Sequence, residues 1–103
     1  MDTPAQREDG RGMGVYILRC ADETLYTGAT KDVERRIMEH NSDTIGAKYT
    51  KIRRPVSLVY FETCESWSGA CKREFAIKQL SREKKLELVR EYTLDKTKDR
   101  VAL

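Results

Sequence analysis

The sequence contains no long hydrophobic run. None of its apolar stretches approaches the roughly 18–20 residues that a helix needs to span a membrane. Its first twelve residues, MDTPAQREDGRG, lack the apolar centre of a secretory signal and carry Pro, Gly and charged side chains instead. We therefore expect a cytoplasmic protein in which residues 1–12 form a disordered leader.

Cysteine is also scarce. The three cysteines, Cys20, Cys64 and Cys71, are an odd number without tight pairing, so we do not expect a disulfide framework. They form no C-x₂-C pair, the spacing that is typical of zinc sites. A zinc site that combines these thiols with His40 is therefore only a minor alternative.

The composition nevertheless suits a folded domain. Hydrophobic residues make up 39% of the 103 residues and charged residues 36%, which is well outside the regime of disordered chains. A core of this size has no room to divide, so one domain is expected.

The positive charge is concentrated in one segment. The net charge is +3, and residues 45–56 (IGAKYTKIRRPV) contain Lys48, Lys51, Arg53 and Arg54 without any acidic residue. A concentrated basic patch favours an anionic partner more than scattered charges do. A solvated loop with no partner is the alternative.

Strands are predicted in three places. The runs VYILRC and LYTGAT, joined by a polar connector at Asp22 and Glu23, predict a β-hairpin. Residues 56–62 (VSLVYFE) predict a third strand, because five of these seven residues are β-branched or aromatic.

Helices are predicted in three further places: residues 31–40, about 69–80, and a stretch from Ser81 to Tyr92. Thr30 stands where the first helix needs an N-cap, and Ser66 or Ser68 can cap the second. The basic segment between the first helix and the third strand predicts no regular structure, and residues 93–103 are expected to form a frayed tail.

Two polar residues lie beside the apolar stripe of the first helix. Val33 and Ile37 form that stripe, and Arg36 and His40 flank it at the same spacing of four. A guanidinium there suits bidentate contact with a phosphate, although it can also simply cover the edge of the core. His40 is either a catalytic group or a partner for the helix dipole.

Glu74 occupies an unusual position in the second helix. It follows Ala70 by four residues and precedes Ile77 by three, so a helix that buries those two should partly bury Glu74. A buried carboxylate needs a cation or hydrogen-bond donors, and Mg²⁺ prefers carboxylate oxygen. The alternative is an i,i+4 ion pair with Lys78.

The order of these features resembles the GIY-YIG nuclease superfamily. Gly14-Val15-Tyr16 and Tyr26-Thr27-Gly28 stand for the two name-giving triplets, and Asp32-x₃-Arg36-x₃-His40 and Arg73-Glu74-x₂-Ile77-Lys78 follow in order. The segment GAKYTKIRRPVSLVY is similar to the short single-domain bacterial branch, which is related to structure-specific endonucleases. The resemblance covers residues 13–92. It implies an α/β sandwich with a three-stranded antiparallel sheet flanked by helices.

The resemblance also implies a catalytic set, namely Tyr16, Tyr26, Arg36, His40 and Glu74. Glu74 would bind Mg²⁺ (or Mn²⁺), and Arg36 would hold a phosphate oxygen. Taken singly, Tyr16 and Tyr26 would be core residues. In this set Tyr16 is the candidate general base, provided that Arg36 and the metal lower its pKa, while Tyr26 orients the reactants and His40 relays a proton.

The function that this resemblance implies is a metal-dependent endonuclease that hydrolyses DNA phosphodiester bonds, in branched or single-stranded DNA, with a place in DNA repair. Lys48, Lys51, Arg53 and Arg54 would grip backbone phosphates. We find no counterpart to the asparagine that some members carry, and no second domain for target recognition. The alternative is therefore a non-catalytic nucleic-acid-binding module of the same fold, or one that depends on a partner protein for recognition. A third interpretation is an interaction domain whose basic loop binds protein or anionic lipid.

Overall fold

The computed structural model describes residues 12–42 and 48–101, and it describes the side chains of residues 12–42 and 50–94. The predicted leader, residues 1–12, lies outside the described residues except for Gly12. In the part of the chain that is described, no helix is long and apolar enough to cross a membrane.

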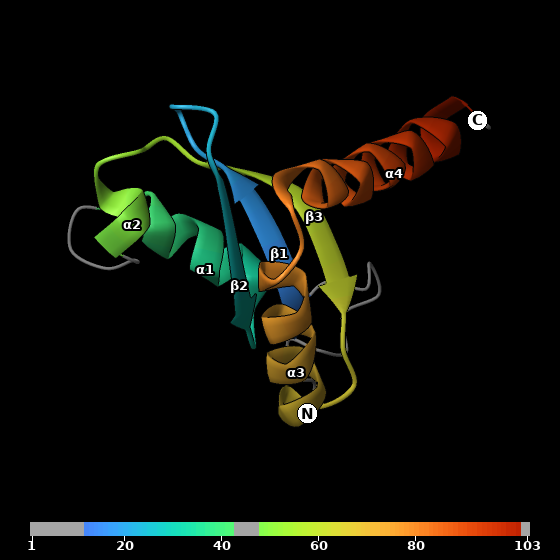
Figure 1. Cartoon of the computed structure of the whole chain (residues 1–103), viewed down its shortest axis with the longest axis horizontal. Coiled ribbons are helices and arrows are strands. Elements are labelled where there is room, and N and C mark those ends of the chain that lie inside the picture. The colour runs from blue at the N-terminus through green and yellow to red at the C-terminus, as the bar shows by residue number, and fades with distance from the viewer. Residues whose placement is uncertain (1–11, 43–47, 102–103) are drawn as a thin grey trace.

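The centre of the molecule is a three-stranded antiparallel sheet (Figure 1). Its strands are β1 (Gly14–Arg19), β2 (Leu25–Thr30) and β3 (Ser57–Thr63), in the order β2-β1-β3. This sheet confirms the predicted fold class. The central strand, β1, is apolar at nearly every position because helices cover both faces of the sheet.

One face of the sheet is covered by helix α1 (Val33–His40). Tyr16 and Leu18 of β1 point to this face and pack in a buried cluster with Val33, while Ile37 packs against the edge of that cluster. The predicted inward stripe of this helix is therefore confirmed.

Two longer helices, α3 (Trp67–Lys78) and α4 (Arg82–Val101), cover the opposite face (Figure 1). Val15 and Ile17 of β1 pack there against Ala70 and Ile77 of α3, and Leu88 of α4 joins them. Ser66 is the N-cap of α3, and its hydroxyl accepts a hydrogen bond from the backbone N–H of Gly69, so one of the two predicted caps is confirmed.

The beginning of α1 differs from the prediction. Its N-cap is Asp32 and not Thr30, and the Asp32 carboxylate accepts a hydrogen bond from the backbone N–H of Arg35 at 3.2 Å. Thr30 instead holds the preceding turn, because its hydroxyl accepts a hydrogen bond from the backbone N–H of Asp32 at 3.1 Å. Both residues can cap a helix, and the sequence does not show which turn precedes it.

Two further segments are more helical than predicted. A short helix, α2 (Lys48–Lys51), lies within the basic segment that was expected to lack regular structure. Helix α4 continues to Val101 and so includes most of the predicted tail, residues 93–103. The tail sequence TLDKTKDRV contains neither Gly nor Pro to end the helix.

Candidate active site

The register of the β1–β2 hairpin places two tyrosines on the same face of the sheet. Tyr16 lies opposite Gly28 and Leu18 lies opposite Tyr26, and residues directly opposite each other in an antiparallel pair share a face. The ring centroids of Tyr16 and Tyr26 are 6.4 Å apart. The two predicted phenols therefore belong to one group, on the face that α1 covers.

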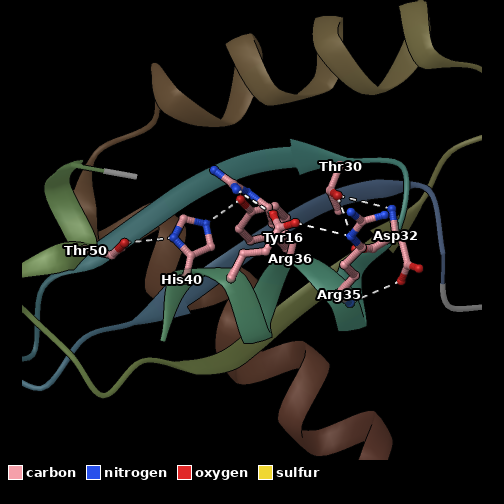
Figure 2. A network of polar contacts seen from close by, with 8 residues as sticks. Tyr16, Thr30, Asp32, Arg35, Arg36, His40 and Thr50 are labelled. Atoms are coloured by element: carbon pink, nitrogen blue, oxygen red, sulfur yellow. Dashed lines mark hydrogen bonds and ion pairs between the residues drawn. The ribbon is translucent and has the colours of Figure 1, made fainter. Parts of the chain in front are cut away.

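His40, the last residue of α1, lies against both tyrosine rings. Its ring centroid is 5.0 Å from that of Tyr26 and 5.8 Å from that of Tyr16. Figure 2 shows the Tyr16 hydroxyl directed at His40, with 2.9 Å between the phenol oxygen and Nε2. On its other side, His40 Nδ1 lies 2.8 Å from the Oγ1 atom of Thr50. All of Tyr16, His40 and Thr50 are buried, with 1% or less of each residue exposed.

Arg36 completes the group from the preceding turn of α1. Its positive charge lies near the Tyr16 hydroxyl and acts to lower the pKa of that phenol, and its guanidinium forms an ion pair with Glu39 at 2.8 Å. Its side chain is 27% exposed, so the cation remains open to a ligand from solvent. This ion pair brings Glu39 to the edge of the group.

Burial determines the protonation of this group. It raises the pKa of Tyr16 to about 12, because the lowering effect of the Arg36 guanidinium is smaller than the cost of burying a phenolate. Burial, together with the nearby Arg36 charge, lowers the pKa of His40 to about 4. Arg36 lowers the pKa of Tyr16 as expected, but by less than burial raises it, and the contribution expected from a metal stays a prediction. At neutral pH the phenol and the imidazole are both uncharged.

Glu74 on α3 is partly buried and already paired with a cation. Its carboxylate forms the i,i+4 ion pair with Lys78 at 3.0 Å, and its side chain is only 25% exposed. Its negative charge is the smallest of the influences on the pKa of Tyr16 and acts to raise it, so the carboxylate lies within electrostatic reach of the phenol. The predicted ion pair is therefore confirmed, and the metal-binding role stays a prediction.

A divalent metal at Glu74 would have few protein ligands. Within residues 12–42 and 50–94, no group of three His, Cys, Asp or Glu side chains could hold a metal ion. A single carboxylate is still a donor that fits Mg²⁺, because this ion is commonly held by one or two carboxylates, several waters and the substrate phosphate.

The basic segment is partly occupied with its own structure. Arg53 forms an ion pair with Asp22 at 3.0 Å. Arg54 donates to the backbone carbonyls of Lys51, at 2.9 Å, and of Ser42. The Lys51 side chain is exposed, whereas that of Lys48 lies outside the described residues.

Two residues of the site were not predicted from the sequence. Thr50 carried no signal, because a threonine within a basic loop has no periodic pattern that indicates its burial. Glu39 did carry a signal, since an acid three residues after Arg36 on a helix is placed to pair with it.

Comparison with known proteins identifies the family. Residues 12–87 match the model of the GIY-YIG catalytic domain. The chain belongs to the GIY-YIG family. This result confirms the resemblance that the motifs indicated, and membership of the family implies nuclease activity. The GIY-YIG match includes every residue of the tyrosine group as well as Glu74.

Relatives of this GIY-YIG chain carry the name UPF0213 protein. One, from Syntrophus aciditrophicus, is 57% identical over 77 residues, which cover 75% of this chain and 88% of the relative. Another, from Desulfotalea psychrophila, is 62% identical over 76 residues, covering 74% and 69%. A protein from E. faecalis with a solution NMR structure is 40% identical in sequence to this chain. The structural match covers 82% of this chain and 92% of that protein, with a TM-score of 0.54.

Proposed function

We propose that residues 13–92 form a metal-dependent endonuclease domain that hydrolyses phosphodiester bonds in DNA, with branched or single-stranded DNA as the substrate. The observation that carries this proposal is the convergence of Tyr16, Arg36 and His40 in one group, in which the Tyr16 hydroxyl lies 2.9 Å from His40 Nε2. A buried phenol, a buried imidazole and a partly exposed guanidinium provide a proton relay next to a site for a phosphate.

Arg36 binds the phosphate in this mechanism. Its guanidinium reaches solvent on one side and the Tyr16 hydroxyl on the other. A non-bridging phosphate oxygen held by Arg36 therefore comes close to the phenol. As water attacks the phosphorus atom, the guanidinium stabilises the charge that develops on the phosphoryl oxygens.

The protons move in a concerted step. The pKa of Tyr16, about 12, lies far above that of His40, about 4, so a preformed phenolate–imidazolium pair is strongly disfavoured. Tyr16 therefore gives its proton to His40 Nε2 only as it accepts one from the attacking water. The water oxygen bonds to phosphorus in the same step, and the bond from phosphorus to the leaving oxygen breaks. Tyr26 packs against the imidazole and limits its rotation.

Glu74 is the residue that would hold the metal, and we propose Mg²⁺ (or Mn²⁺). A divalent ion bound there would act as a Lewis acid on the phosphate and would stabilise the negative charge on the leaving oxygen. The basic segment would extend the contact along the nucleic-acid backbone, with Lys48 and Lys51 binding phosphate and with Arg53 and Arg54, which are paired within the chain, shaping the loop. In the cell, this chemistry suits a cytoplasmic role in DNA repair, acting on branched intermediates.

The test is cleavage of labelled single-stranded, duplex and branched DNA, with Mg²⁺ and with a chelator. We expect chelator-sensitive cleavage that falls in Tyr16→Phe by about 10² or more, the range that general base catalysis contributes. Tyr60→Phe is the matched control. Tyr60 is on β3 and its hydroxyl donates to Glu62, on the face that α3 and α4 cover. Equal activity of the two variants would overturn the proposal.

A non-catalytic or partner-dependent binding module is the second candidate. The Arg36–Glu39 ion pair favours it, because a phosphate must compete with a carboxylate that is already bound. This candidate predicts salt-sensitive DNA binding without cleavage, and cleavage only after a partner protein is added. RNA substrates in the same assay test whether the domain cleaves DNA or RNA. This test is needed because none of the proposed site residues is proposed to contact a 2′-hydroxyl.

A further inference from the structure

Thr50 contacts the site from outside the four motifs that contain the candidate catalytic residues. It lies in the short helix α2, within the basic segment, and none of its side chain is exposed. Its Oγ1 atom is 2.8 Å from Nδ1 of His40, and Figure 2 shows the two side chains facing each other. Its backbone carbonyl accepts a hydrogen bond from the N–H of Arg53 at 3.0 Å. Thr50 therefore joins the basic segment to the imidazole.

The imidazole of His40 can exist as two neutral tautomers, and only one of them is useful to Tyr16. At neutral pH the ring carries a single N–H, on either Nδ1 or Nε2. With the proton on Nδ1, the lone pair of Nε2 faces the Tyr16 O–H and can take its proton. With the proton on Nε2, His40 donates to the phenol and cannot act as its base.

Arg36 favours the first arrangement. The guanidinium is positively charged and carries only N–H groups, so it favours the orientation in which the lone pairs of the Tyr16 phenol oxygen face it. The Tyr16 hydroxyl can then donate its own proton toward Nε2, which lies 2.9 Å away. The other tautomer would place the Nε2–H at the phenol oxygen and would turn the phenol proton away from His40, toward the positive charge.

We propose that Thr50 is a positioning residue whose Oγ1 accepts the Nδ1–H of His40, which keeps the Nε2 lone pair directed at the Tyr16 hydroxyl. The proposal rests on the proposed function, because it concerns the same proton relay. When Nε2 takes the proton of Tyr16, Nδ1–H remains in place and Thr50 accepts from it throughout. The tautomer is thus selected before the substrate binds.

The direct test is the tautomer itself, read by NMR. His40 is the sole histidine of the chain, so a long-range ¹H–¹⁵N spectrum of ¹⁵N-labelled full-length protein contains one imidazole. Protonated and unprotonated ring nitrogens resonate far apart. We expect Nδ1 protonated and Nε2 unprotonated in the wild type and in Thr50→Ser, and loss of that preference in Thr50→Val. A wild-type ring protonated on Nε2, or a Thr50→Val ring unchanged from the wild type, overturns the proposal.

Thr27→Val is the matched control for the removal of a buried threonine hydroxyl. Thr27 pairs with Ile17 and points to the sheet face opposite the site, and its Oγ1 has no hydrogen-bond partner among the described residues. We expect the His40 spectrum of Thr27→Val to match the wild type. A shifted tautomer in this variant would assign the effect to general repacking and so contradict the role of Thr50.

Cleavage kinetics provide the second measurement. We expect kcat of Thr50→Val to fall about tenfold or more with KM nearly unchanged, and Thr50→Ser to restore it, because the loss is part of the roughly 10²–10⁴-fold contribution of general base catalysis. The two failures can be distinguished. A wild type that keeps the Nδ1–H tautomer but cuts no DNA contradicts the proposed function alone. Wild-type kcat in Thr50→Val contradicts the role of Thr50 alone.

Discussion

The phenol of Tyr16 crosses over the backbone of Gly28, its partner on the neighbouring strand. A Cβ atom at position 28 would lie 2.5 Å from the Tyr16 hydroxyl oxygen and 2.6 Å from the ring carbon that carries it. Both distances are far below van der Waals contact. The glycine of the second triplet is therefore the space through which the tyrosine of the first triplet reaches His40 and Arg36.

Gly28→Ala should consequently displace the Tyr16 hydroxyl. Because Tyr16 is 1% exposed, the ring has no free space to move into, and we expect a loss of roughly 1–3 kcal/mol in the free energy of unfolding. We also expect a larger loss of cleavage than this destabilisation explains, since the phenol leaves its hydrogen bond with His40 and its place beside Arg36. Urea unfolding and cleavage of labelled DNA measure the two effects.

Gly69→Ala is the control for this prediction. Gly69 lies in the first turn of α3, where an added Cβ meets only the Ser66 hydroxyl, at 3.1 Å, and where alanine favours the helix. We expect cleavage at the wild-type level in this variant. Wild-type cleavage in Gly28→Ala as well would show that the close packing of Tyr16 and Gly28 has no catalytic role.

The sequence predicted most of this fold, for local reasons. The two strand-like runs and the polar connector between them predicted the hairpin, and its register in the structure places Tyr16 and Tyr26 on one face. The spacing of Arg36 and His40 belongs to a single helix, so the sequence also predicted that the two side chains lie on the same side of that helix. What the sequence could not provide was the contact of His40 with Thr50, because it joins a helix to a loop and follows no period. The sequence also could not show that the pKa of Tyr16 is raised, since burial outweighs a neighbouring charge only in the folded chain.

The burial of His40 predicts a pH-dependent stability. Its pKa is about 4 in the folded chain against 6.5 when unfolded, so between these values the unfolded chain binds a proton that the folded chain does not. The contribution of His40 to the free energy of unfolding should therefore have its full value above pH 6.5. It should fall by roughly 3 kcal/mol as the pH drops to about 4. At the alkaline end, the raised pKa of Tyr16 means that stability declines as the pH rises from 10 toward 12.

Urea unfolding at a series of pH values between 4 and 7 measures the acid limb. His40→Gln is the control, because it has no titrating ring and should lose the slope between pH 6.5 and 4, although it begins from a lower stability. If the variant and the wild type show the same slope, the carboxylates of the chain and not His40 are responsible.

The Arg36–Glu39 ion pair predicts that one carboxylate restrains substrate binding. Glu39 holds the guanidinium that is proposed to bind phosphate, and both side chains are partly exposed, so the pair contributes only about 0.5–1 kcal/mol. We expect Glu39→Gln to tighten DNA binding a few-fold, measured as Kd by fluorescence anisotropy, with little change in stability. Glu34→Gln removes the same charge from an exposed position of the same helix. Equal tightening in both variants would indicate a general charge effect and contradict competition at Arg36.

Glu74 and Lys78 form a pair in which each partner can be removed alone. Glu74→Gln should lower Mg²⁺-dependent cleavage by about two orders of magnitude, because several kcal/mol of transition-state stabilisation come from the metal that Glu74 is proposed to hold. Lys78→Ala breaks the same ion pair and leaves the carboxylate, so cleavage should persist, with half-maximal rate at a lower Mg²⁺ concentration. A similar loss in both variants would mean that Glu74 serves only the ion pair.

The basic segment should divide into residues that bind DNA and residues that build the loop. Lys51 is exposed, so Lys51→Ala should weaken DNA binding, reduce the slope of log K against log salt by about 1, and leave the melting temperature unchanged. Arg54 donates to the backbone carbonyls of Lys51 and Ser42, so Arg54→Ala should cost roughly 1–2 kcal/mol of stability. Anisotropy titrations at several salt concentrations, beside thermal melts, separate these effects. A reduced salt slope at full stability in Arg54→Ala would place Arg54 among the phosphate contacts instead.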